Sequence, residues 1–86
     1  MDRVIVTVQV PAYQKSFDME LPVSQKVGDL LDDIIQAIVG YMPELMIRSR
    51  ESALYSMRNK SYLAPDRTPE EEGVWNGDVL ALGAVS

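Results

Sequence analysis

Side chains that could perform chemistry are few in this sequence, and those that cluster are carboxylates. Histidine and cysteine are both absent from the 86 residues. Catalytic triads and dyads built on imidazole or thiolate are therefore excluded, as are metal sites built on those ligands. An enzyme would have to work with carboxylates, lysine or tyrosine alone, so we expect a protein that is not an enzyme.

Two groups of acidic residues are the candidates for a metal site. Asp29, Asp32 and Asp33 are close together, and residues 70–72 are three consecutive glutamates. No loop rich in oxygen ligands surrounds either group, as a calcium or magnesium site would require. A solvated helix face explains the aspartates, and carboxylates in a first helical turn interact favourably with the helix dipole. We therefore expect neither a metal nor another cofactor.

The charge and the glycine pattern argue against phosphate-containing ligands. The formal net charge is −5, whereas a grip on nucleic acid needs a concentrated basic surface. The five glycines are scattered and form no phosphate-binding pattern. The sequence also has no run of about 18 apolar residues and no signal-peptide pattern, so we expect a cytoplasmic protein that does not insert into a membrane.

Two runs of alternating residues predict an N-terminal β-hairpin. Every second residue of segment 3–10 is a valine, which is the period of a strand with one buried face. Residues 11–14 interrupt this run. In segment 17–22, Phe17, Met19 and Leu21 then alternate with acidic residues and predict the second strand.

Residues 27–38 have the spacing of an amphipathic helix. Its apolar positions are Val27, Leu30, Leu31, Ile34, Ile35 and Ile38. Ser24 is the expected N-cap, because its hydroxyl can accept a hydrogen bond from an unpaired backbone N–H, and Gly40 is the expected stop. Gly28 costs about 1 kcal/mol relative to alanine inside a helix, which predicts either close packing at that position or a tolerated weakness.

The C-terminal half predicts shorter elements. Residues 43–44 can open a short helix, although the segment 45–51 can also be irregular. Residues 53–58 and 62–63 are expected to form the third and fourth strands. Two registers are open for the third strand, with opposite sets of side chains facing inward: Leu54, Ser56 and Arg58, or Ala53, Tyr55 and Met57.

Capping and turn signals complete the chain. Thr68 and Glu71, with Pro69 between them, have the form of a capping box and predict a single helical turn that ends at Gly73. Residues 76–78 predict a turn. The closing strand then contains Val79, Leu80 and Leu82.

This order of elements predicts one α+β domain over residues 1–86, with one main helix packed across a mixed sheet of four to five strands. The order resembles ubiquitin, and more closely the YukD/EsaB family of bacterial ubiquitin-like proteins of type VII (ESX-like) secretion. Two stretches carry the resemblance: residues 17–34, with the motifs FDMELP and LLDDI, and residues 73–82, GVWNGDVLAL. The first also looks like the ubiquitin-like cytosolic domain of EccD. The resemblance implies the β-grasp fold.

The resemblance also implies a function. It indicates a non-catalytic adaptor or regulatory component of a type VII secretion system, with partners among the ATPase or membrane subunits. One alternative is a ubiquitin-like modifier or sulfur carrier, which the end of the sequence disfavours. Such proteins present an exposed Gly-Gly at the C-terminus, whereas Gly83 is single here and Ala84, Val85 and Ser86 follow it. A generic interaction domain, homodimeric through its sheet, is the other alternative.

Four residues are candidates for a partner-binding patch, by analogy with the patch through which ubiquitin is recognised: Tyr13, Tyr55, Met57 and Trp75. Core packing is the alternative for Tyr55 and Met57, because the two registers of their strand exchange its faces. Trp75 is expected to be partly exposed, and tryptophan is enriched among binding hot spots.

Charge is distributed unevenly along the chain. Five of the eight basic residues fall in the C-terminal half, namely Arg48, Arg50, Arg58, Lys60 and Arg67, while the first helix carries three aspartates. This asymmetry indicates either ordinary surface solubility or electrostatic steering towards a partner.

Overall fold

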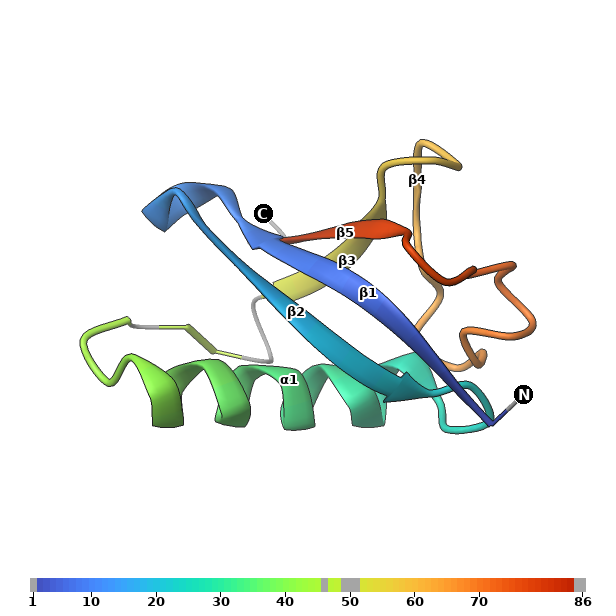
Figure 1. Ribbon diagram of the computed structural model, residues 1–86, viewed down its shortest axis with the longest axis horizontal. Helices are drawn as coiled ribbons and strands as arrows, with labels where there is room; N and C mark the ends of the chain where they lie inside the picture. The colour runs from blue at the N-terminus through green and yellow to red at the C-terminus, as the bar shows by residue number, and fades with distance from the viewer. Residues whose placement is uncertain (1, 46, 49–51, 85–86) are drawn as a thin grey trace.

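The computed structural model describes residues 2–45, 47–48 and 52–84 (Figure 1). The elements in chain order are β1 (Arg3–Val10), the short 3-10 helix η1 (Pro11–Tyr13), β2 (Lys15–Pro22), α1 (Val27–Tyr41), β3 (Ser52–Ser56), β4 (Ser61–Tyr62) and β5 (Val79–Ala84). The predicted hairpin, helix and closing strand are all present. Among the described residues, no helix is long and apolar enough to cross a membrane.

The strands form a mixed sheet in the order β2-β1-β5-β3-β4. β1 is antiparallel to β2 and parallel to β5, and β3 is antiparallel to both β5 and β4. Figure 1 shows α1 crossing one face of this sheet, while no other helix covers the opposite face within the described chain. The structure therefore confirms the ubiquitin-like β-grasp fold that the order of elements predicts.

The core lies between α1 and the sheet. The four alternating valines of β1 are buried, as are all six apolar helix positions that the spacing predicted. Leu54, Leu80 and Leu82 from β3 and β5 complete the packing. Burial of one such side chain contributes about 1.5–3 kcal/mol, so this shared apolar face holds the helix on the sheet.

The prediction that Ser24 caps the helix is wrong. The N-cap is Lys26, with no side-chain capping hydrogen bond, and Ser24 lies in the preceding turn. The first helical N–H groups instead bond to backbone of a later loop: Val27 N donates to Arg67 O over 2.8 Å, and Gly28 N donates to Pro65 O over 2.9 Å. A tertiary contact thus satisfies the donors that a local cap would have satisfied.

The packing expected at Gly28 is confirmed. A Cβ atom added at this position would lie 3.2 Å from Pro65 O and 3.4 Å from Pro65 Cβ. The hydrogen bond from Gly28 N to the same carbonyl holds the two backbones together. The close approach of a second segment therefore favours glycine here, because a larger side chain would require Pro65 to shift.

The prediction that Gly40 stops the helix is also wrong, since α1 continues to Tyr41 and its C-cap is Met42. The next residue is Pro43, and a residue before proline is disfavoured in the α region, so the helix ends there. Residues 43–44 form a turn and open no helix, and the described residues 45 and 47–48 are irregular. The remainder of the predicted segment 45–51 lies outside the described residues.

The third strand adopts the register that buries Leu54 and Ser56, but the prediction that Arg58 also faces inward is wrong, because Arg58 lies in the turn after the strand and is exposed. It ends at Ser56, two residues earlier than predicted, because a turn follows. Lys60 N donates to Ser56 O over 2.8 Å, and Asn59 N donates to the Ser56 hydroxyl over 3.2 Å. The short fourth strand is also displaced from residues 62–63 to 61–62.

The predicted capping box is present. Glu71 N donates to Thr68 Oγ1 over 3.2 Å, and Thr68 N donates to Glu71 Oε1 over 3.0 Å. Glu72 N donates to Thr68 O, which is the bond of one helical turn, but the segment is a series of turns rather than a helix. Gly73 follows with a φ of 69°, as a glycine stop requires.

The contact at Gly28 predicts an asymmetry between two glycines of the same helix. Gly28→Val would force methyl groups against Pro65, so the free energy of unfolding should fall by about 1–3 kcal/mol. Gly40→Val is the matched control, because no atom lies within 4 Å of a Cβ built at Gly40. Its effect should stay within about 0.5 kcal/mol. Urea denaturation measures both, and equal losses would contradict the proposed role of Pro65.

Candidate protein-interaction surface

The sheet face opposite α1 carries a continuous row of side chains across four strands. The register aligns Gln9 with Ala81, Ala81 with Tyr55, and Tyr55 with Tyr62. Residues paired in register point to the same side of a sheet. Since the neighbouring row of Val8, Leu80 and Ser56 is buried beneath α1, this row faces outward.

Apolar side chains are exposed on this face. Ile5 is 57% exposed and Tyr62 is 63% exposed, while Val79 and Tyr55 are half-buried. The rings of Tyr55 and Tyr62 meet edge to face, with centroids 5.1 Å apart. Met57, which is 46% exposed, follows Tyr55 by two residues, and its N–H donates to Val79 O. We call Ile5, Tyr55, Met57, Tyr62 and Val79 the outer-face patch.

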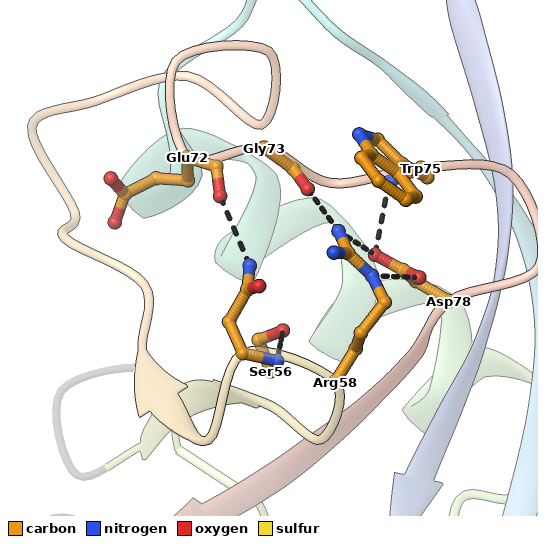
Figure 2. Close-up of polar contacts among 7 residues, drawn as sticks. Ser56, Arg58, Glu72, Gly73, Trp75 and Asp78 are labelled. Carbon is orange, nitrogen blue, oxygen red and sulfur yellow. Dashed lines mark hydrogen bonds and ion pairs between the residues drawn. The ribbon is translucent and has the colours of Figure 1, made fainter.

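Trp75 lies in the loop before β5 and is held by an arginine. The guanidinium carbon of Arg58 lies 3.8 Å from the centroid of the Trp75 ring, and the indole remains 64% exposed. Figure 2 shows the indole over the guanidinium, with Asp78 beside it. A cation stacked on an indole in this way contributes about 0.5–1 kcal/mol at an exposed site.

Asp78 fixes the arginine. Arg58 Nε donates to Asp78 Oδ1 over 2.9 Å, and Arg58 Nη2 donates to Asp78 Oδ2 over 3.1 Å, which makes a bidentate pair. Arg58 Nη2 also donates to the Gly73 carbonyl oxygen (Figure 2). Trp75 N donates to Asp78 Oδ2 over 2.9 Å, so one carboxylate positions both members of the stack.

The carboxylate is nearly buried, with 7% of the side chain exposed. The hydrogen bonds from Arg58 lower the pKa of Asp78 below its ordinary value of 3.8, and the Trp75 N–H acts in the same direction, whereas burial opposes them. The pKa of Arg58 is raised by the same hydrogen bond. The pair therefore stays ionised at neutral pH, and the loop that carries Trp75 is held in place.

The same loop is attached to β1. Ile5 N donates to the Asn76 side-chain oxygen over 2.8 Å, and Gly77 N donates to Ile5 O over 2.8 Å. Gly77 has a φ of 85°, which explains the glycine in the predicted turn. These bonds place the Trp75 loop beside Ile5, at the margin of the outer-face patch.

The four predicted contact residues do not all come together. Tyr55 and Met57 lie on the outer face, as one of the two registers requires. Trp75 stacks on Arg58, the residue after Met57 in the chain. Tyr13 belongs to η1, which follows the last residue of β1, whereas the Trp75 loop is bonded near the first residues of β1. Tyr13 is 37% exposed and lies at the other end of the sheet.

Sequence reasoning missed two exposed members of the patch, Ile5 and Tyr62. Ile5 stands on the polar side of the valine alternation, so a search for apolar residues on that side would have found it. Tyr62 depends on its pairing with Tyr55, which no local pattern reveals. The ion pair of Arg58 and Asp78, separated by 20 residues, likewise carried no sequence signal.

The ion pair predicts how stability depends on pH. Asp78→Asn places an amide N–H₂ against the guanidinium, so at pH 7 the free energy of unfolding should fall by about 1–3 kcal/mol. The folded-state pKa of Asp78 lies below its unfolded value of 3.8. The stabilisation is therefore complete above that value and is lost as pH falls through the folded pKa. Urea denaturation from pH 7 to pH 2.5 should show the difference between wild type and variant shrinking at the acid end.

Asp66→Asn is the control for this prediction, because Asp66 is an exposed aspartate of a nearby turn. Its effect should remain within about 0.5 kcal/mol. If the difference between wild type and Asp78→Asn were the same at every pH, ionisation of Asp78 would not be its source.

The most informative structural similarities are to ubiquitin-like domains of secretion systems. The EccD5 ubiquitin-like domain from Mycobacterium xenopi is 13% identical, with a TM-score of 0.80, over 100% of this chain and 98% of that chain. The ubiquitin-like domain of Mycobacterium tuberculosis EccD1 is 18% identical, with a TM-score of 0.74, over 95% and 98%. A chain of the ESX-5 inner membrane complex is 18% identical, with a TM-score of 0.83, over all of this chain and 22% of that one.

These identities are low, so the structural similarities establish the fold alone. No curated protein matches the sequence. A family model does match, that of the WXG100 protein secretion system (Wss) protein YukD, and the match spans residues 3–82. The matched residues include the whole of α1, the loop that carries Trp75, and all the strands, with β5 matched up to Leu82. The chain therefore belongs to the YukD family of the WXG100 protein secretion system.

Proposed function

We propose that this protein is a non-catalytic, cytoplasmic adaptor of type VII secretion, which docks on the ATPase or membrane subunits through the outer-face patch and Trp75. The observation that supports this proposal most directly is an exposed apolar surface beside a tryptophan that is held rigid. Isolated exposed apolar residues are ordinary. Here three exposed residues, Ile5, Met57 and Tyr62, share the face that α1 does not cover with the half-buried Tyr55 and Val79.

Rigidity matters for affinity because binding must offset the entropy of ordering side chains. An immobilised side chain costs about 0.5–1.5 kcal/mol when a partner orders it. Trp75 is already stacked on Arg58, which Asp78 holds through two hydrogen bonds. A partner that covers this indole would meet a preordered anchor of the residue type most enriched at hot spots.

The charges beside the patch favour a partner with acidic residues at its rim. Arg58 and Lys60 are in the turn after β3 and are solvent-accessible, whereas the aspartates Asp29, Asp32 and Asp33 are exposed on α1, across the sheet. An acidic partner surface would be attracted to Arg58 and Lys60. It would be repelled by the aspartates of α1, and also by Asp18 and Glu20, which are exposed on the β2 side of the outer face. Such complementarity acts mainly on association rate and orientation.

Tyr13 would extend the contact area along the sheet. It lies beyond the far end of β5, a strand of six residues, so the two ends of the surface are separated by about 20 Å. A standard protein interface of about 800 Å² per partner can cover that length. The proposed contact residues are therefore Tyr13, Tyr55, Met57 and Trp75, together with Ile5 and Tyr62.

The structural neighbours support the choice of partner. One of them is a chain of the ESX-5 inner membrane complex, of which this chain spans 22%. A similar fold thus occurs within the larger subunit of a secretion membrane assembly. A free-standing domain of the same shape could contact equivalent surfaces of its own system through protein–protein interactions.

The test is a binding measurement between the purified protein and the cytosolic part of the cognate type VII ATPase or membrane subunit. Trp75→Ala should weaken binding by about 30-fold, which corresponds to about 2 kcal/mol for a hot-spot residue. Gln36→Ala is the control, because Gln36 is exposed on α1 and lies outside the outer-face patch. Its affinity should remain within about twofold of wild type.

Secretion of the WXG-type substrates should decrease when the gene is deleted, and the Trp75→Ala protein should restore it poorly. Circular dichroism checks that each variant is folded. If the wild-type protein binds no secretion subunit and its deletion leaves secretion unchanged, the adaptor proposal is wrong. If Gln36→Ala weakens binding and Trp75→Ala does not, the partner binds elsewhere.

A further inference from the structure

β2 is an edge strand whose outer side is unpaired within the described chain. Val23 N donates to Asp2 O over 3.0 Å, which continues the antiparallel ladder of β1 and β2. Hydrogen-bonded pairs alternate along such a ladder, so Phe17, Met19 and Leu21 direct their backbone groups towards β1. The N–H and C=O groups of Ser16, Asp18 and Glu20 therefore point away from the sheet.

The neighbouring pairing confirms this assignment. Thr7 N donates to Asp78 O, and Ile5 O accepts from Gly77 N, so odd-numbered residues of β1 direct their backbone groups towards β5. Even-numbered residues of β1 are left to bond with β2, and their register partners are Leu21, Met19, Phe17 and Lys15. The pairings on both sides of β1 thus agree that Ser16, Asp18 and Glu20 direct their backbone groups towards the free edge of β2.

A groove of mixed lining runs beside this edge, between β2 and α1, with a volume of about 490 Å³. Its apolar lining residues come from both elements: Met19, Leu21, Pro22, Leu30, Ile34 and Ala37. Its polar lining residues are Arg3, Glu20, Gln25 and Asp33. Two residues extend this lining: Phe17, which is two residues before Met19 on β2, and Tyr41, which is one turn after Ala37 on α1. Their rings meet edge to face with centroids 6.1 Å apart, and Tyr41 is 79% exposed.

Proteins usually prevent strand addition with prolines, bulges or charged side chains at the edge. Of these, the segment from Ser16 to Glu20 has the charged side chains Asp18 and Glu20, but neither a proline nor a bulge. The register of β1 and β2 is unbroken over eight pairs, so β2 has no bulge. Phe17, Met19 and Leu21 face the helix side, and Pro22 stands only at the end of the strand. The segment from Ser16 to Glu20 is therefore able to accept another strand.

Charge selects the kind of strand that fits. Asp18 and Glu20 are exposed on the face away from the helix, and Asp33 lies at the groove. A second copy of β2 would bring like charges together, which destabilises a cross-strand pair. A strand in which apolar and basic residues alternate would place its apolar side chains in the groove and its cations beside Asp18 and Glu20.

The interactions that Asp18 and Glu20 already make leave both carboxylates available to the cations of a bound strand. Glu20 pairs with Arg3 over 3.5 Å, and both side chains are more than half exposed, so the pair is weak. Asp18 accepts one hydrogen bond from the Thr7 hydroxyl over 2.8 Å, which keeps its charge and orients it on this face.

We propose that the β2 edge and the β2–α1 groove bind an extended protein segment with alternating apolar and basic residues, which adds to the sheet as a further strand. Main-chain hydrogen bonds to Ser16, Asp18 and Glu20 supply affinity, and the groove and the acidic face supply specificity. The acidic side of this surface adjoins the outer-face patch, because Glu20 pairs in register with Ile5. The proposal does not depend on the proposed adaptor role.

The test uses a short synthetic peptide in which valine and lysine alternate, with a valine–glutamate peptide as the control. Amide hydrogen exchange is followed by NMR on the full chain. At a peptide concentration ten times its Kd, the Asp18 and Glu20 amides should exchange about tenfold more slowly. The Phe17 and Met19 amides, which already donate to β1, should change little.

Two matched variants test the groove. Ala37→Arg places a long side chain at a residue that lines it, whereas Gln36→Arg adds the same charge at an exposed residue that does not. The first should weaken peptide binding by at least about tenfold, and the second by less than about twofold. The double variant Asp18→Lys/Glu20→Lys should reverse the preference, so that the valine–glutamate peptide binds more tightly. Amide spectra confirm that each variant is folded.

Four results would overturn the proposal. The valine–lysine peptide could show no saturable binding, or both peptides could bind equally. The peptide could perturb Ile5, Tyr55 and Met57 in place of the β2 edge. Finally, protection of Asp18 and Glu20 could rise with protein concentration in the absence of peptide, which would make a second copy of the chain the occupant.

Discussion

The parallel pairing of β1 with β5 is the constraint on which the rest of this structure depends. It joins the first and last strands of the chain at the centre of the sheet. The valines of β1 and the leucines of β5 then share one buried face, against which α1 packs. The same pairing leaves β2 and β4 as the two edges, and no described helix covers the face opposite α1.

The pairing also positions the loop before β5. Thr7 N bonds to Asp78 O, so the residue that begins the parallel ladder is also the one that holds Arg58. A nearly buried carboxylate is costly unless its lone pairs are satisfied, and Asp78 accepts from both Arg58 and Trp75. The interaction that satisfies Asp78 thus also positions the exposed indole, so the proposed contact residue and the stability of the loop depend on the same carboxylate.

The molecule combines the ubiquitin shape with two distinct surfaces. The outer-face patch is apolar and carries rigid aromatic residues, whereas the β2–α1 groove is bordered by an unpaired strand edge and by acidic residues. Fold similarity at 13–18% identity does not determine which surface is used. The side chains exposed on a shared fold decide its function, and these two surfaces differ in the chemistry that they offer a partner.

Local patterns in the sequence determined most of the elements. The valine alternation predicted β1 and its buried face, the apolar spacing predicted α1, and Thr68 with Glu71 predicted a capping box that is present. Gly77 predicted its turn because few residues other than glycine adopt a positive φ. Each of these signals lies within a few residues of the structure that it specifies.

Only the tertiary structure decided the features that depend on distant partners. The start of α1 is set by Pro65 and Arg67 rather than by Ser24, because their carbonyls accept from its first N–H groups. The register of β3 was undecided in a sequence of alternating mixed residues, and pairing with β5 decided it by placing Leu54 opposite Leu82. The stack of Arg58 on Trp75 likewise exists only after Asp78 has been brought to both. Hydrogen bonds and packing between remote segments have no sequence period, so their outcome depends on the folded chain.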